Sequence, residues 1–137
     1  FRRMGNIRLI VRIVYDASAG WGGGTWQAPP NNWGNRPARY DLSKADRLTF
    51  WARGEQGGET VEFRMGLSGS RAGKYRDSAV VSTGRIRLST DWTPYSIDVS
   101  VADRSHVING FSWTVYSSGA RAVIYLDDVR YEGPAVP

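Results

Sequence analysis

The stretch Leu48-Thr49-Phe50-Trp51-Ala52-Arg53 alternates in side-chain character, with Leu48, Phe50 and Ala52 forming one apolar set. A period of two places alternate side chains on opposite faces of a β-strand. The same alternation recurs in the segments Ile7 to Tyr15, Thr60 to Met65, Arg85 to Leu88, Tyr95 to Val99, Phe111 to Tyr116 and Val123 to Arg130. No window of about 11 residues sustains a helical period. The chain is therefore predicted to be all-β.

Turn-forming residues separate these segments. Glycine and serine gather at Gly54 to Gly58, Gly66 to Gly73, Ser82 to Gly84 and Ser117 to Gly119. Short strands with turns at this spacing are typical of an antiparallel β-sandwich or barrel. We expect one domain over residues 1–132, followed by a linker or tail over residues 133–137, where glycine and proline precede the end of the sequence.

Composition excludes several classes of protein. The 137 residues contain no cysteine, so disulfides, zinc–thiolate sites and a cysteine nucleophile are ruled out. No apolar run reaches the roughly 18 residues that a membrane-spanning helix needs. The net charge is +5, but the basic residues are scattered, without the runs typical of nucleic-acid binding. We expect the charge to serve solubility first.

Three of the six tryptophans stand between Gly20 and Gly34, in the sequence GWGGGTWQAPPNNWG. Glycine and proline argue against a long regular element there, so the rings are expected on loops or at strand ends. Exposed aromatic rings on loops often mark binding sites. The face of an indole packs well against the C–H groups of a sugar ring. The stretch therefore predicts a sugar site in which Trp21, Trp26 and Trp33 stack on the ligand and Gln27, Asn31 and Asn32 hydrogen-bond its hydroxyls.

Other residues are candidates of second rank. Tyr75 and Arg76 belong to a polar loop, Ser68 to Asp77, that could border a ligand site. Trp113 and Tyr116 stand on the Phe111 to Tyr116 strand. Each of these four residues is a possible further ligand contact, although Trp113 is also suited to the core.

An acidic pair, Asp127-Asp128, interrupts the apolar strand Val123 to Arg130. One of the two carboxylates must point inward or toward a neighbouring loop, and a buried carboxylate needs a cation or several N–H donors. Calcium and an arginine are both suitable partners. Both readings of the pair stay open.

The sequence gives little support to catalysis. The single histidine, His106, has no partner in sight, and no G-x-S-x-G, H-E-x-x-H or P-loop pattern occurs. A jelly-roll polysaccharide lyase, or a binder of uronic-acid polysaccharides, would suit the basic charge; His106, Tyr75 and Arg76 would then be the residues to examine. A protein-interaction sandwich, with the tryptophans docking a partner, is the third alternative.

The motifs taken together resemble a known group. Gly20-Trp21, Trp26-Gln27, Asn31-Asn32-Trp33-Gly34, Tyr40-Asp41-Leu42-Ser43, Leu48 to Gly54 and Tyr125-Leu126-Asp127-Asp128-Val129 resemble the β-sandwich carbohydrate-binding modules of bacterial polysaccharidases, and most of all the family 81 module. The resemblance extends from Ile7 to Glu132.

The resemblance implies a jelly-roll module that is not an enzyme. It would bind β-1,4-glucan chains such as cellulose and cello-oligosaccharides, with xyloglucan or mixed-linkage β-glucan as further ligands. It would be a secreted, extracellular bacterial protein, monomeric, and tethered to a glycoside hydrolase such as a family 5 endoglucanase. Related modules often hold a structural calcium through the last strand, which here corresponds to Asp127 or Asp128.

Overall fold

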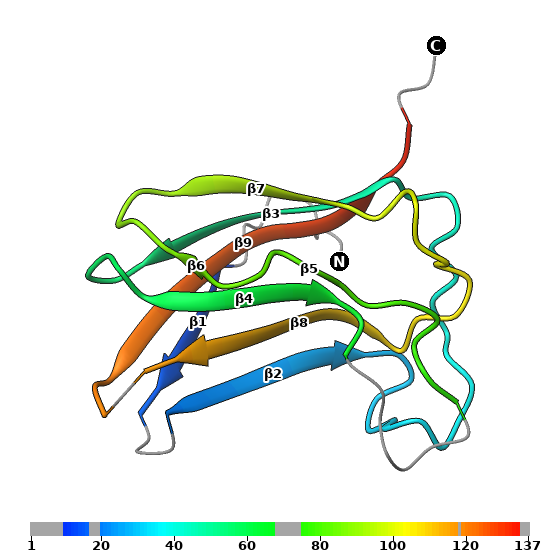
Figure 1. The fold of residues 1–137 in the computed structure, drawn as a ribbon, viewed down its shortest axis with the longest axis horizontal. Helices are drawn as coiled ribbons and strands as arrows, with labels where there is room; N and C mark the ends of the chain where they lie inside the picture. Colours follow the sequence, from blue (N-terminus) through cyan, green and yellow to red (C-terminus); the bar gives the residue numbers. More distant parts are fainter. Residues whose placement is uncertain (1–9, 17–19, 68–74, 118, 135–137) are drawn as a thin grey trace.

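The computed structural model describes residues 10–16, 20–67, 75–117 and 119–134. All regular elements in these ranges are β-strands (Figure 1). They are β1 (Ile10–Tyr15), β2 (Trp21–Gln27), β3 (Arg47–Gly54), β4 (Thr60–Met65), β5 (Val81–Ser82), β6 (Ile86–Arg87), β7 (Thr93–Asp98), β8 (Asn109–Tyr116) and β9 (Ala122–Glu132). Within the same ranges, no helix is long and apolar enough to cross a membrane.

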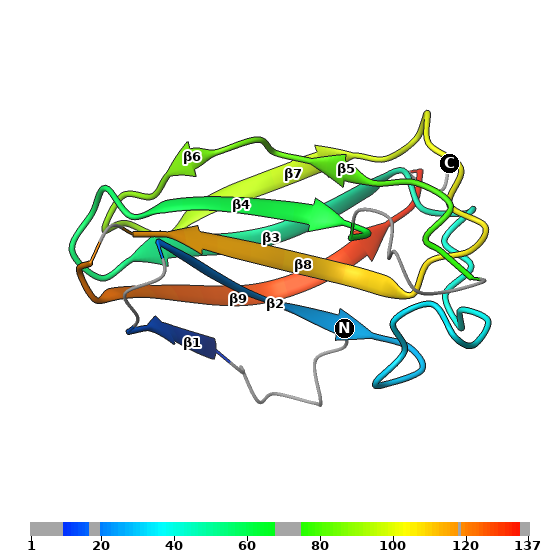
Figure 2. The same ribbon diagram turned by 60° about the horizontal axis from the view of Figure 1, so that its bottom comes forward.

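The strands form two antiparallel sheets that face each other as two layers (Figures 1 and 2). The first sheet has the order β1-β9-β3-β7. The second has the order β2-β8-β4-β5, with β6 also paired to β4. The predicted all-β sandwich of the jelly-roll type is confirmed. Strand β9, apolar on both faces at its start, lies between β1 and β3 and is therefore an inner strand.

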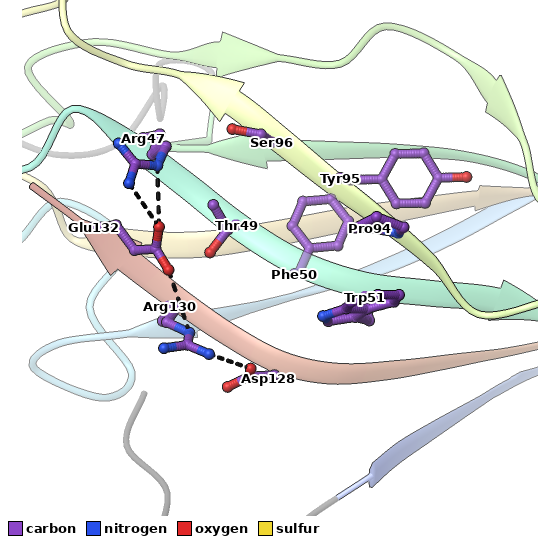
Figure 3. A pocket seen from close by; sticks show the side chains of 10 residues that line it. All are labelled: Arg47, Thr49, Phe50, Trp51, Pro94, Tyr95, Ser96, Asp128, Arg130 and Glu132. Atoms are coloured by element: carbon purple, nitrogen blue, oxygen red, sulfur yellow. Dashed lines mark hydrogen bonds and ion pairs between the residues drawn. The ribbon is translucent and has the colours of Figure 1, made fainter. Parts of the chain in front are cut away.

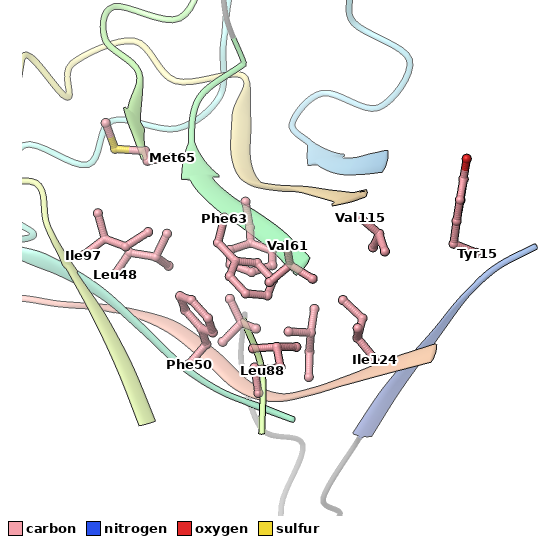
Figure 4. Close-up of a cluster of buried hydrophobic side chains, with 14 of the residues drawn as sticks. Tyr15, Leu48, Phe50, Val61, Phe63, Met65, Leu88, Ile97, Val115 and Ile124 are labelled. Atoms are coloured by element: carbon pink, nitrogen blue, oxygen red, sulfur yellow. The ribbon is translucent and has the colours of Figure 1, made fainter. Parts of the chain in front are cut away.

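Aromatic rings from both sheets fill the space between the layers (Figure 4). Phe50 of β3 lies 4.7 Å from Phe63 of β4, and Phe63 lies 5.7 Å from Phe111 of β8, measured between ring centroids. All three side chains are buried. In β3, β4 and β8, the apolar set that alternation identified thus faces inward.

Strand β2 departs from the sequence expectation. Glycine and proline argued against a long regular element at this point. Trp21–Gln27 nevertheless pairs with β8, so Trp21 stands at a strand end as expected, whereas Trp26 lies within the strand. A Cβ atom on Gly22 would lie 2.4 Å from the Tyr15 ring, and one on Gly24 would lie 2.4 Å from the Trp113 ring. The glycines are required by close packing against two large rings, so here they do not mark a loop.

The loops after β2 and before β8, together with residues 75–80 before β5, meet at one end of the sandwich (Figure 1). Ala28 N–H donates to the Ile108 carbonyl (2.9 Å), and Tyr75 N–H donates to the Gly34 carbonyl (2.8 Å). Tyr40 and Val107 form an isolated β-bridge across the same region. This loop end holds several residues that the sequence singled out. Residues 1–9 and 68–74, which carried the start of one expected strand and most of the polar loop, lie outside the described ranges.

Candidate functional site

Trp21 begins a row of polar side chains on the outer face of the second sheet. Because Gly22, Gly24 and Trp26 point inward, Trp21 and Thr25 point outward, opposite Tyr116 and Ser112 of β8. Trp21 is 62% exposed. We call this surface the Trp21 face; it comprises Trp21, Thr25, Glu62, Arg64, Ser112, Thr114 and Tyr116.

The polar groups of the Trp21 face are joined by hydrogen bonds. Glu62 accepts from the Tyr116 hydroxyl (3.0 Å) and from the Ser82 hydroxyl (2.6 Å), and pairs with Arg64 (3.1 Å). The hydrogen bond from Ser82 lowers the pKa of Glu62, with Tyr116 and Arg64 acting in the same direction. The Arg85 guanidinium lies 3.8 Å from the centre of the Tyr116 ring. Tyr116 is therefore held in a fixed orientation beside Trp21.

Asn32 and Gln27 build the loop that follows β2. The Asn32 side chain accepts from the backbone N–H groups of Gly34 and Arg36 (both 3.1 Å) and donates to the Arg36 carbonyl (2.8 Å). Gln27 accepts from Asn32 N–H (3.0 Å). Asn32 is 0% exposed, so its burial favours a structural role over the expected contact with sugar. The loop that these amides shape presents Trp33, which is 55% exposed, and leaves the neighbouring Asn31 exposed.

A pocket of about 110 Å³ lies beside Trp33. Trp33, Tyr75, Arg76, Asp77 and Asn109 contribute to its lining. The structure thus brings together three residues that the sequence proposed from two separate segments. We call this site the loop pocket.

Hydrogen bonds of the Asn109 side chain connect the loop pocket with the Trp21 face. The side-chain oxygen Oδ1 of Asn109 accepts from the Thr25 hydroxyl (3.0 Å) and from the Gln27 side-chain amide (3.1 Å). The Asn109 amide donates to Asp77 (2.8 Å), which also accepts from Leu67 N–H (2.9 Å). The sequence analysis included Asp77 in the polar loop without singling it out, and it missed Asn109. Each of the two acquires its partners from a distant segment.

The His106 ring stacks on Tyr75, a residue of the loop pocket, with 6.1 Å between the ring centroids. Its Nε2 accepts from Ala38 N–H (3.0 Å), so the proton of the neutral ring is on Nδ1, which donates to the Arg76 carbonyl (2.7 Å). Both nitrogens are occupied by backbone groups. The residues considered for a lyase do lie together, but His106 is engaged as a loop brace and is not placed to take a proton from a ligand.

Trp26 and Trp113 point between the sheets. The Trp26 ring stacks on Phe111 at 5.3 Å and lies 5.0 Å from Trp113. Both rings pack against the core cluster. Their positions indicate core packing where ligand contact was expected, and the reason is the alternation of β2 and β8, which turns them away from Trp21 and Tyr116.

Asp127 and Asp128 stand at an irregularity in the pairing of β9 with β3. Asp127 is buried on β9, opposite Trp51. Asp128, with φ of 54°, places its carboxylate 2.5 Å from Arg130. The arginine alternative therefore applies to Asp128. The Arg130 guanidinium occupies this carboxylate and competes with a metal ion for it. Among the described residues no group of three His, Cys, Asp or Glu side chains is placed to hold a metal ion. Calcium also accepts backbone carbonyl oxygens as ligands, so calcium at this pair stays a prediction.

No protein-family model matches the chain, and a search of curated proteins finds no match. Solved structures do resemble it. A family 30 carbohydrate-binding module is 15% identical with a TM-score of 0.58, covering 99% of this chain and 78% of that chain. The family 30 module of a cellulosomal cellulase from Clostridium thermocellum is 14% identical with a TM-score of 0.55, covering 96% and 85%.

The family 11 module from Clostridium thermocellum, solved in complex with a β-1,3-1,4-mixed-linked tetrasaccharide, is 11% identical with a TM-score of 0.53, covering 94% of this chain and 85% of that chain. At these identities the likeness shows the fold. The chain thus has the fold of carbohydrate-binding modules, and the finer assignment to family 81 stays a prediction.

Proposed function

We propose that this protein is a non-catalytic carbohydrate-binding module that holds a β-1,4-glucan chain along the Trp21 face and into the loop pocket. The observation that carries the proposal is a pair of exposed indoles: Trp21 stands at the start of β2, and Trp33 stands in the loop that follows the end of the same strand. Strand β2 spans seven residues, so its ends are about 20 Å apart at the usual rise per residue. That length suits an extended chain of several sugar rings.

The chemistry of the surface supports a sugar ligand. An indole face attracts the C–H groups of a pyranose ring. Between the two indoles, Thr25, Tyr116 and the paired Glu62 and Arg64 offer both donors and acceptors to hydroxyls. Since Glu62 and Arg64 neutralise each other, the centre of the face favours a neutral chain over a uronic-acid polymer.

The two carboxylates beside the proposed site, Glu62 and Asp77, support binding without cleavage, because hydrogen bonds engage both of them. Glycoside hydrolysis by the usual mechanism needs two carboxyl groups flanking the bond to be cut. Glu62 is engaged by Tyr116, Ser82 and Arg64, and Asp77 accepts from the Ile108, Asn109 and Leu67 backbone N–H groups. Carboxylates that already accept several hydrogen bonds are poorly placed to exchange protons with a substrate.

The proposed biological role is to keep a tethered glycoside hydrolase near its polysaccharide outside the cell. The similar family 30 module belongs to a cellulosomal cellulase, and the similar family 11 module was solved with a mixed-linkage tetrasaccharide. These facts support β-glucan as the ligand class. Monomeric state, secretion and xyloglucan binding are parts of the same proposal.

Affinity electrophoresis on a panel of neutral and acidic polysaccharides tests the ligand class. We expect hydroxyethyl cellulose and mixed-linkage β-glucan to retard the protein, and alginate and pectate to leave it unretarded in salt that screens its positive charge. Retardation by the uronic-acid polymers alone would contradict the proposal and favour the acidic-polysaccharide alternative. Retardation by none of them would favour the protein-interaction alternative.

We propose calcium as a structural ion near Asp127, on the strength of the resemblance to modules that hold calcium through the last strand. A thermal melt with and without a chelator tests it, because a metal bound only to the folded state raises the melting temperature. An Asp127→Asn variant should then lose its response to calcium. Equal melting temperatures of the wild type with calcium and with chelator would contradict the proposal that the folded protein binds calcium.

A further inference from the structure

The outer face of the first sheet carries a hollow of about 430 Å³ between β7, β3 and β9 (Figure 3). We call it the Trp51 groove. Trp51 of β3 lies in this groove and is 40% exposed. It alternates along the strand with the buried residues Phe50 and Ala52. The groove lies on the side of the sandwich opposite the Trp21 face. A large aromatic ring that is exposed in a hollow often marks a ligand-binding site.

An irregularity in β9 shapes the groove. The pairing of β3 with β9 shifts between Thr49 and Trp51, and Asp128 at the same place has a positive φ of 54°. Such bulges turn side chains away from their regular directions. Here the bulge brings the Asp128 carboxylate to the groove that Trp51 lines, where it contacts Arg130.

Charged side chains alternate in sign along the groove. Arg47 contacts Glu132 (2.9 Å), Glu132 contacts Arg130 (3.6 Å), and Arg130 contacts Asp128 (2.5 Å). Figure 3 shows this series running beside Trp51. The two cations balance the two anions, so the series attracts neither an acidic nor a basic ligand strongly. A guanidinium has five N–H groups, so Arg47 and Arg130 keep donors for a further partner.

Hydroxyl groups complete the lining. Thr49 and Ser96 face the groove from β3 and β7 and are partners in the pairing of these strands. An aromatic face, two hydroxyls and a balanced set of fixed donors and acceptors match a neutral sugar unit: its C–H face packs on the indole and its hydroxyls meet the charged and hydroxyl groups.

We infer that the Trp51 groove is a second saccharide-binding site, which takes a neutral hexose unit of a polysaccharide chain. The inference rests on the proposed function for the ligand class, but on different residues for the site. Two sites on opposite faces let one molecule bridge two chains or two segments of one chain. Linked sites raise the overall avidity for a polymer without raising the affinity for a short oligosaccharide at either site.

Calorimetry with cellohexaose and turbidity with soluble mixed-linkage β-glucan test the second site. We expect the wild type to bind about two hexasaccharides and to cross-link the polymer into a turbid suspension. Trp51→Ala should bind about one hexasaccharide, leave the remaining affinity unchanged and give a clear solution. Trp51→Phe, which keeps an aromatic ring, is the matched control and should retain turbidity.

The outcomes separate this inference from the proposed function. Wild-type stoichiometry and turbidity in Trp51→Ala would overturn the second site and leave the Trp21 face in place. Full binding by a Trp21→Ala/Trp33→Ala variant, abolished by adding Trp51→Ala, would keep the Trp51 groove and overturn the Trp21 face. Absence of sugar binding in the wild type would overturn both.

Discussion

At the scale of one residue, the neighbouring amides Asn31 and Asn32 have different tasks. Asn32 is buried and makes hydrogen bonds to backbone groups of Gly34 and Arg36, whereas Asn31 is exposed. Asn31 also adopts a left-handed conformation, with φ of 56°, which asparagine tolerates better than most residues. The same residue type thus shapes the loop at one position and is free to face a ligand at the next.

Asn32→Ala should destabilise the protein by about 1–3 kcal/mol, because it leaves buried backbone groups without partners. Urea denaturation measures the loss. Binding of cellohexaose should weaken as well, since the loop that presents Trp33 loses its support.

Asn31→Gly is the matched comparison, since glycine accepts the positive φ and only the exposed amide is lost. We expect little change in stability and a weaker affinity for sugar. An affinity equal to that of the wild type would remove Asn31 from the contacts. A stability loss as large as that of Asn32→Ala would contradict the division of tasks between the two residues.

At the scale of one element, β2 shows how packing overrides local propensity. Gly22 faces the Tyr15 ring and Gly24 faces the Trp113 ring, and neither ring leaves room for a methyl group. The strand carries the exposed Trp21 at its start and the partly buried Trp26 near its end. The geometry of the proposed site therefore depends on a strand that its own sequence disfavours.

Gly24→Ala should cost about 1–3 kcal/mol of stability, because the added carbon would lie 2.4 Å from the Trp113 ring. Thermal or urea unfolding measures the cost. Trp21→Ala on the same strand is the control and should change stability little, since its side chain is exposed. A Gly24→Ala variant as stable as the wild type would show that β2 does not pack as closely as described.

Alternation predicted most strands correctly because it is a local signal: the buried set of Leu48, Phe50 and Ala52 is visible within β3 itself. Trp26 could not be placed in this way, since three glycines before it carry no hydrophobic signal. Its burial follows from the register with Phe111, which only the pairing of β2 with β8 determines.

The candidate site was predictable in part for the same reason. Trp21, Trp33, Tyr75 and Arg76 stand out by residue type, and the fold exposes the first two and joins the last three in the loop pocket. The hydrogen bond between Asn109 and Asp77 could not be predicted, because it joins residues 32 positions apart in the sequence. Trp51 is not among the candidates that the sequence offers, since its strand gives no sign of the bulge in the neighbouring β9.

At the scale of the whole molecule, hydrogen-bonded carboxylates govern the response to acid. The hydroxyls of Ser43, Ser100 and Ser105 lower the pKa of Asp41, Asp98 and Asp103, each two residues earlier. The Ser82 hydroxyl does the same for Glu62. A lowered pKa means that the folded state binds protons less readily than the unfolded chain.

Stability should therefore be at its plateau above about pH 5 and fall as the pH drops through the lowered pKa values. Thermal melts from pH 7 to pH 2, in high salt to screen the growing positive charge, measure the effect. Glu62→Gln should show a smaller loss, since one of the titrating groups is gone. A stability that rises between pH 5 and pH 3 would contradict the assigned direction of these pKa shifts.

The central claim is that Trp21 and Trp33 hold a glucan chain between them. Isothermal titration of cellohexaose into a Trp51→Ala background, with and without Trp21→Ala and Trp33→Ala, tests it most directly. Each stacked ring should contribute about 1–2 kcal/mol, so each single variant should bind roughly five- to thirtyfold more weakly, and the double variant should bind weakest. An affinity unchanged in the double variant would contradict the account.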